Sequence, residues 1–359
     1  MIPYGRQSIS EEDIEAVVKV LRGDWLTQGP AIEAFEERLT IETEARYCVA
    51  FSSGTAALHA SAAAAGLGEG DTVATTPLTF AASGACARYV GADLKLVDID
   101  AESHNIDLRA IPSEVDAAVV VHYAGNPVDL SDWDARPRVV IEDAAHALGA
   151  LTPSGPVGNC AHSDMTCFSF HPVKTITAGE GGAVTTNDPD LAERLRSFRH
   201  HGIHRLPEEG RWAYEIPEVG YNYRITDIQA ALGLSQLNRL HSFVQRRNEL
   251  AARYHSLLED LPLVLPHEPG EGVVHGRHLF PIQVEDRGRV LESLRDLGVA
   301  CQVHYVPLYR HRAYVDPHVG PKDFPKCEAA YQRLLSIPIF PDMTNEDQDV
   351  VVAALKEVL

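Results

Sequence analysis

A lysine between an apolar run and a glycine-rich turn has the clearest chemical signature in this sequence. Lys174 follows the apolar segment 168–170 and precedes the turn Gly-Glu-Gly-Gly at residues 179–182. Desolvation at the end of a buried strand lowers the pKa of a lysine, and a neutral amine attacks carbonyl groups. Most lysines are solvated surface residues, so this pattern alone leaves both interpretations open. If Lys174 has a catalytic function, the chemistry that this pattern indicates is imine formation.

An apolar strand that ends in two carboxylates is the second candidate. Residues 139–141 are followed by Glu142 and Asp143, and then by a run of small residues that reaches His146. A carboxylate at the C-terminal edge of a sheet can hold a buried cation, such as a protonated pyridine nitrogen, and raise its pKa. The alternative is a solvated aspartate that caps a helix. His146 would then orient Asp143 or contact a bound ring.

A Ser/Gly segment at the start of an Ala-rich helix is the third candidate. Residues 52–58 read Ser-Ser-Gly-Thr-Ala-Ala-Leu, and Gly54 allows close approach of the backbone. Free N–H groups and the helix dipole favour an anion there, although a plain helix cap has the same composition. An anion site, a cation-pairing carboxylate and a buried lysine on one sheet are together what pyridoxal 5'-phosphate (PLP) requires.

The elements expected around these residues indicate an α/β fold. Apolar strands are expected at 47–51, 72–76, 94–97, 118–122, 139–142, 165–170 and 183–186, with helices at 55–66 and 80–90. This alternation is typical of a mostly parallel sheet buried on both faces. A first helix is expected after the capping box of Ser10 and Asp13, and a long helix over 225–258.

A smaller α+β unit is expected towards the C-terminus. It comprises strands at 278–284 and 300–305, a helix at 289–297, and a last helix capped by Thr344 with Asp347. The predicted division is a large PLP-binding domain over residues 1–245, including the N-terminal helix, and a small domain over 246–359.

Charge and composition narrow the classes of partner. The 31 basic and 51 acidic residues give a formal charge of −20, which disfavours nucleic acid and anionic lipid as partners. No apolar stretch is long enough to cross a bilayer, the N-terminus does not resemble a signal peptide, and six cysteines show no metal-ligand spacing. We therefore expect a cytoplasmic protein without membrane or metal partners.

Four segments resemble the DegT-type PLP-dependent sugar aminotransferases, which have the aspartate-aminotransferase-like fold (fold type I). The segments read SSGTAALH, EDAAHALGA, SFHPVKTITAGEGGAV and GYNYRITDIQAALG, and the resemblance runs through almost the whole chain. Within the family the segments HPVKTITAGEGGAVTTND and GYNYRITDIQAALGLSQL are most similar to the transaminases of pseudaminic acid biosynthesis.

The resemblance implies a role for each matching cofactor position. Lys174 should form the Schiff base and transfer the proton, Asp143 should keep the pyridinium protonated, and Phe80 should stack on the ring. Gly54, Thr55 and Ser169 should hold the phosphate. Asn222 should reach the phosphate of the neighbouring subunit, which implies a homodimer with shared active sites.

The resemblance also implies substrates and the positions that contact them. An amino acid, glutamate in most relatives, is expected to donate its amino group to C4 of a nucleotide-linked 4-keto-6-deoxy sugar, the UDP-linked pseudaminic acid precursor. The substrate positions expected are Tyr4, Trp25, Leu26, Thr27, Arg224, His304, Tyr305, Val306 and Pro307.

Three alternatives remain, and two of them would have a sequence signature of their own. A dTDP- or GDP-linked keto-sugar would leave the reaction unchanged. A PLP-dependent sugar 3-dehydratase would carry histidine in place of Lys174. A non-catalytic PLP-binding regulatory protein would have lost Lys174 or Asp143, and a basic helical module would precede it.

Overall fold

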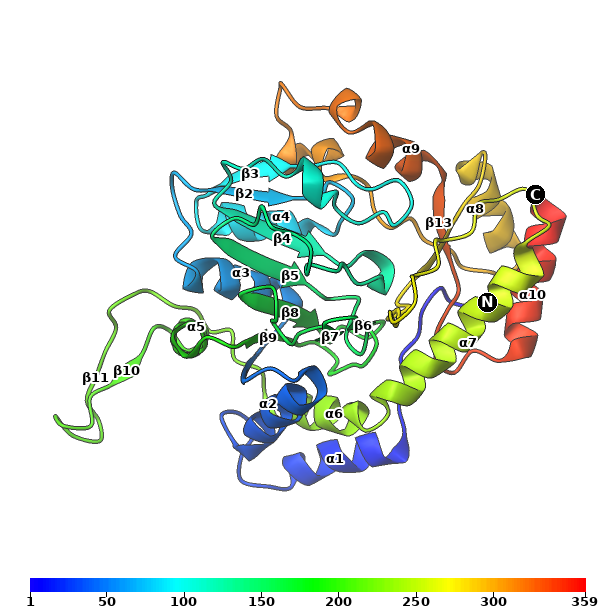
Figure 1. The fold of residues 1–359 in the computed structure, drawn as a ribbon. Coiled ribbons are helices and arrows are strands. Elements are labelled where there is room, and N and C mark those ends of the chain that lie inside the picture. Colours follow the sequence, from blue (N-terminus) through cyan, green and yellow to red (C-terminus); the bar gives the residue numbers. More distant parts are fainter.

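A seven-stranded, mainly parallel sheet forms the centre of the protein, as the sequence predicts (Figure 1). The computed structural model describes residues 1–359. Only β9 runs antiparallel to both of its neighbours, β1 and β8. The strands lie in the order β1 (Tyr47–Phe51), β9 (Gly182–Thr186), β8 (Met165–Ser169), β5 (Val139–Asp143), β4 (Ala117–Val121), β2 (Thr72–Thr75) and β3 (Asp93–Leu96).

Helices cover both faces of the sheet, which explains its nearly continuous apolar strands. Along β1, Val49 and Phe51 join the core beneath α3 (Gly54–Ala64), α4 (Ala81–Tyr89) and α5 (Pro189–Arg199). Cys48 and Ala50 face the opposite core, which is covered by α2 (Pro30–Thr43), α6 (Asp227–Leu237) and the start of α7 (Leu240–Leu258). This three-layer arrangement confirms the predicted fold type I architecture.

A separate apolar core forms around the C-terminal part of the chain. It contains the antiparallel pair β12 (Phe280–Gln283) and β13 (Leu334–Ile337), with α8 (Arg287–Asp296), α10 (Asn345–Val358) and the second half of α7. The predicted domain boundary after residue 245 falls inside α7, so the chain passes from one core to the other along a continuous helix. The domain division itself stays a prediction.

The first and last helices begin where the sequence predicts. Ser10 and Asp13 form a capping box at α1 (Glu11–Leu21), and Thr344 with Asp347 forms another at α10. The remaining elements are α9 (Pro325–Arg333) and the short pairs β6 (Leu151–Thr152) with β7 (Gly155–Pro156) and β10 (His204–Arg205) with β11 (Tyr214–Glu215).

Two predicted elements are wrong in detail. The single helix over 225–258 is two helices, α6 and α7, which are separated by Asn238 and Arg239. The strand over 300–305 is a single bridge between Gln302 and Ser336. Beyond this bridge the segment leaves the small sheet, because the side chain of Tyr305 turns towards the large core and contacts His146.

The β10–β11 hairpin extends away from the body of the protein (Figure 1). It carries exposed apolar side chains, with Trp212 78% and Tyr214 53% accessible. No helix is long and apolar enough to cross a bilayer, and all six cysteines are free thiols.

Candidate active site

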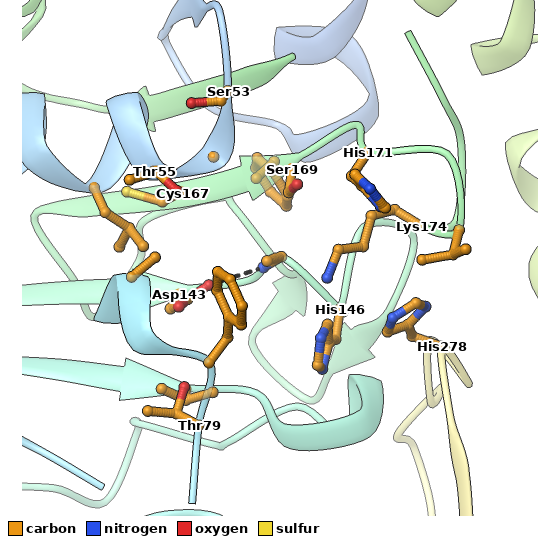
Figure 2. A pocket seen from close by; sticks show the side chains of 18 of the residues that line it. Ser53, Thr55, Thr79, Asp143, His146, Cys167, Ser169, His171, Lys174 and His278 are labelled. Carbon is orange, nitrogen blue, oxygen red and sulfur yellow. Dashed lines mark hydrogen bonds between the residues drawn. The ribbon is translucent and has the colours of Figure 1, made fainter. Parts of the chain in front are cut away.

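A cavity of about 630 Å³ lies at the carboxyl ends of β5 and β8, between the central sheet and the C-terminal unit. Parallel α/β sheets usually bind ligands at this edge, because the loops diverge there. Ten of the residues selected from the sequence line the cavity: Tyr4, Gly54, Thr55, Phe80, Asp143, His146, Ser169, Lys174, His304 and Tyr305. Figure 2 shows several of them around the open space.

The start of α3 and the end of β8 form a cradle for an anion. Ser53 caps α3 by accepting a hydrogen bond from the backbone of Ala56 at 3.1 Å. A Cβ atom on Gly54 would lie 2.9 Å from the Cβ of Ser169, so only glycine permits this close approach. The first-turn N–H groups of a helix lack intrahelical partners, and here they open onto the cavity beside the Ser169 hydroxyl.

Asp143 ends β5 on the cavity floor and is held by a chain of hydroxyl groups. Ser83 Oγ donates to Asp143 Oδ2 at 2.6 Å, and Thr79 Oγ1 lies 2.7 Å from Ser83 Oγ. The backbone N–H of Ala145 donates to Asp143 Oδ1 at 3.2 Å. Ser83 and Thr79 were not identified from the sequence, because only the packing of α4 against β5 brings them to Asp143.

Removal of the Ser83 hydroxyl should weaken cofactor binding. Ser83→Ala leaves Asp143 without its shortest hydrogen bond, so the carboxylate loses orientation towards a ring nitrogen. We expect the dissociation constant for PLP to rise about five- to tenfold, as for a lost hydrogen bond of about 1–1.5 kcal/mol. Fluorescence titration of the apo-protein measures it. Ser61→Ala, which removes a buried hydroxyl bonded to the Ala57 carbonyl, is the control and should change PLP affinity little.

Lys174 projects into the cavity from the turn that follows β8 (Figure 2). Its backbone N–H donates to the carbonyl of His171 at 2.9 Å, which fixes the turn. Burial lowers the pKa of Lys174 to about 8, and the charge of Asp143 acts in the opposite direction. A substantial fraction of neutral, nucleophilic amine is therefore present near neutral pH, as the sequence predicts for an imine-forming lysine.

The pH dependence of cofactor attachment should show this lowered pKa. Below pH 8 the neutral fraction of Lys174 grows about tenfold per pH unit, and above it the fraction levels off. The rate at which apo-protein and PLP form the visible band of the lysine-bound cofactor should follow the same curve between pH 6 and 10. A rate that still rises tenfold between pH 9 and 10 would indicate an ordinary lysine and contradict this prediction.

Three histidines and a tyrosine close the cavity on the side of the C-terminal unit. Tyr305 Oη lies 3.0 Å from His146 Nε2, and the rings of His146 and His278 have centroids 4.3 Å apart. Burial lowers the pKa of His146 and His278 well below the ordinary value and that of His304 to about 3, so all three are neutral. His278 was not identified from the sequence, where its one signal is its position at the start of the strand predicted over 278–284.

The other seven selected positions do not line this cavity within one chain: Trp25, Leu26, Thr27, Asn222, Arg224, Val306 and Pro307. Thr27 bridges Thr226, and the N–H of Asp227 donates to the carbonyl of Leu26 at 2.9 Å, whereas Asn222 bridges His200 and Arg224 Nη1 lies 3.0 Å from His200 Nδ1. Trp25 is 58% accessible. Their roles stay predictions.

The residues of the cavity fit PLP. The cradle between Gly54 and Ser169 suits a phosphate, and the Asp143 carboxylate suits a cationic ring nitrogen. Lys174 lies beside them with an amine that burial keeps partly neutral. The residues of the cavity thus provide partners for the phosphate, the ring nitrogen and the aldehyde of the cofactor.

Comparisons with known proteins agree with this assignment. A model of the DegT/DnrJ/EryC1/StrS aminotransferase family matches residues 7–356. The uncharacterised protein MJ1066 of Methanocaldococcus jannaschii is 38% identical over 100% of this chain and 97% of its own.

Solved structures share the whole fold. Spr1654 of Streptococcus pneumoniae, assigned as a sugar aminotransferase and solved in its PMP form, is 30% identical, with a TM-score of 0.93 over 100% of this chain and 99% of its own. A PLP form of the same protein matches with a TM-score of 0.91 over the same shares of the two chains.

PseC of Helicobacter pylori, an aminotransferase of pseudaminic acid biosynthesis, is 29% identical, with a TM-score of 0.92 over 99% of this chain and 98% of its own. These matches confirm the predicted enzyme class and cofactor. The chain therefore belongs to the DegT/DnrJ/EryC1/StrS family and is a PLP-dependent sugar aminotransferase.

Proposed function

We propose that the protein transfers an amino group from an amino acid, glutamate in the first instance, to C4 of a nucleotide-linked 4-keto-6-deoxy sugar. Bound PLP supplies the electron sink that carries the amino group between the two substrates. The observation that supports this most directly is the meeting of Lys174, Asp143 and the Gly54 cradle in one cavity.

Each side chain of the cavity then has a role that follows from its position. Lys174 attaches the cofactor and moves the proton between the reacting carbons. Asp143 keeps a proton on the ring nitrogen, and Gly54, Thr55 and Ser169 hold the phosphate. Phe80, 59% accessible at the start of α4, stacks on the ring. His146 orients the ring from the side of Tyr305.

For the sugar, we propose the UDP-linked precursor of pseudaminic acid. The match to PseC, at 29% identity, supports this choice. A dTDP- or GDP-linked keto-sugar is the second candidate. Tyr4, His304 and Tyr305 line the cavity, where an aromatic wall can contact a sugar or base.

The cytoplasmic location of the protein stays a prediction.

Single-turnover spectroscopy distinguishes the sugars. The amino form of the enzyme is mixed with UDP-, dTDP- and GDP-linked 4-keto sugars in turn, and return of the visible cofactor band reports amino transfer. We expect return with the UDP-linked pseudaminic precursor. If the band returns only with a dTDP- or GDP-linked sugar, the proposed reaction stands and the proposed substrate is wrong. If the band returns with none of the keto-sugars, the proposed reaction is contradicted.

We further propose a homodimer in which each active site takes residues from both chains. Asn222 and Arg224 do not line the cavity of their own chain and both contact His200 instead. The β10–β11 hairpin also exposes apolar side chains that solvent would not favour, among them Trp212. A second copy that covers this surface would bring Asn222 to the partner's phosphate and Arg224 to its substrate.

Mixing inactive variants tests this arrangement. Lys174→Ala has no attachment site, and the double variant Asn222→Ala, Arg224→Ala lacks the groups offered to the partner. If sites are shared, each heterodimer contains one complete site, so an equal mixture should recover about a quarter of wild-type activity. A mixture as inactive as its components would show that these residues serve their own chain.

A further inference from the structure

His278 is a buried group at the cavity to which the proposed reaction has so far given no role. Its ring packs against His146 and lies near Lys174, and only 4% of the residue is accessible (Figure 2). Its Nδ1 atom has no hydrogen-bond partner within the chain. His278 lines the cavity and its ring makes no hydrogen bond within the chain, so its N–H group is available to a ligand there.

A buried arginine lies directly behind His278. Arg247, in α7, donates from Nη1 to the carbonyls of Arg277 at 3.1 Å, His278 at 3.4 Å and Ile339 at 3.0 Å. It is 1% accessible and forms no ion pair, while its Nε and Nη2 atoms have no partner within the chain. Arg277 differs in this respect, because its charge is paired with Glu268.

Arg247 therefore places a positive charge behind His278 with no carboxylate of the chain to neutralise it. Burial lowers the pKa of Arg247 to about 10, which still leaves it charged at neutral pH. Isolated buried charges are costly, and an anion bound on the open side of His278 would reduce that cost. Burial, followed by the charges of its neighbours, Arg247 included, keeps His278 neutral with one N–H donor.

The part of the cavity wall that one chain provides contains no arginine that could bind an acid. Its charged residues are Asp143, Lys174 and Glu180. In the proposed reaction Asp143 pairs with the ring nitrogen and Lys174 attaches the cofactor, while Glu180 is exposed at the rim. Among the donors on the side of the C-terminal unit, Gln302 is exposed and the Tyr305 hydroxyl is bonded to His146. The buried ring of His278 makes no hydrogen bond and remains available to a carboxylate.

We propose that the carboxylate of the amino-acid donor binds against His278, which donates a hydrogen bond to it in front of the buried charge of Arg247. This inference rests on the proposed transamination. His278 would then determine specificity in the first half-reaction, in which the amino acid gives its amino group to the cofactor. Other side chains would bind the sugar in the second half-reaction.

Separate measurement of the two half-reactions tests the assignment. The holoenzyme is mixed with L-glutamate alone, and the amino form with the keto-sugar alone. His278→Ala should raise the glutamate concentration for half-maximal rate about 10- to 100-fold, as for a lost hydrogen bond to a charged group. The sugar half should change less than about twofold. His278→Gln, which keeps an N–H donor, should recover part of the loss.

Succinate provides a second probe that does not depend on turnover. This dicarboxylate has no amino group, and its binding to the holoenzyme is followed through the visible cofactor band, which also reports that each variant folds. His278→Ala should weaken succinate binding by the same factor as glutamate. His241→Gln, a change of an exposed α7 histidine paired with Glu42, is the control and should bind like the wild type.

The outcomes separate this inference from the proposed function. Unchanged binding of succinate and glutamate by His278→Ala, or equal losses in both half-reactions, would overturn the role of His278. Loss of succinate binding in Arg224→Ala, with His278→Ala unaffected, would place the carboxylate on the partner's arginine instead. A wild type that binds succinate through His278 but reacts with no amino acid would contradict the proposed reaction and not the carboxylate site.

Discussion

Replacement of Lys174 with alanine should abolish covalent attachment of the cofactor and reduce transamination by at least about 10⁴-fold. The side chain is both the point of attachment and the group that moves the proton, and proton transfer by a positioned side chain alone contributes about 10²–10⁴. Absorbance spectra of the purified protein should lack the visible band of the lysine-bound cofactor. Borohydride should fix no cofactor to the variant, whereas it should fix it to the wild type.

Lys19→Ala is the matched control, because Lys19 is an exposed lysine on α1 far from the cavity in the fold. It should keep the visible band and the full rate. If Lys174→Ala still held PLP covalently, another amine would be the attachment site and the assignment of the cavity would be wrong.

Replacement of Asp143 with asparagine should slow turnover by about 100- to 1000-fold while PLP still binds. A neutral amide keeps the shape of the side chain but provides no charge to hold a proton on the ring nitrogen. Preorganised charges of this kind contribute about 10²–10³ to a rate. Steady-state kinetics with saturating cofactor measure the loss, and a PLP titration shows that the site is still formed.

The neighbouring Glu142 provides a control with the same chemistry on the other side of β5. Its carboxylate accepts hydrogen bonds from His122 at 2.9 Å, Ser163 at 2.5 Å and Thr166 at 2.9 Å, and it does not line the cavity. Glu142→Gln should lower the free energy of unfolding by about 1–3 kcal/mol and leave turnover within a few-fold. Equal rate losses in the two variants would mean that Asp143 acts through the fold alone.

The large domain was predictable because its chemistry is local in sequence. Asp143 and Ser169 each end a buried strand, Lys174 follows one closely, and Gly54 opens the helix after another. Parallel strands bring such termini to one edge of the sheet, so strand order alone places these residues together. The sequence therefore predicted correctly where the cavity lies, and the roles of the individual residues stay predictions.

The parts that were missed depend on contacts between distant segments. His278 reaches the cavity because Arg247, 31 residues earlier, binds its carbonyl. Ser83 reaches Asp143 through packing of α4 against the sheet. The predicted strand over residues 300–305 failed because Tyr305 bonds His146 across the cavity instead of extending the ladder. No periodicity within either segment encodes such pairings.

Helix α7 limits how this chain could be recombined with its relatives. Its early residue Phe243 fills the core of the large sheet, and Leu250, two turns later, fills the C-terminal core. A chimera joined after residue 245 would combine half-helices from two parents, yet Phe243 would stay with the core of the large sheet and Leu250 with the C-terminal core. A crossover beyond Leu258, where α7 ends, would set Leu250 and Tyr254 of one parent against the β12, β13 and α10 side chains of the other in the C-terminal core. Functional chimeras should therefore arise from the earlier junction and not from the later one.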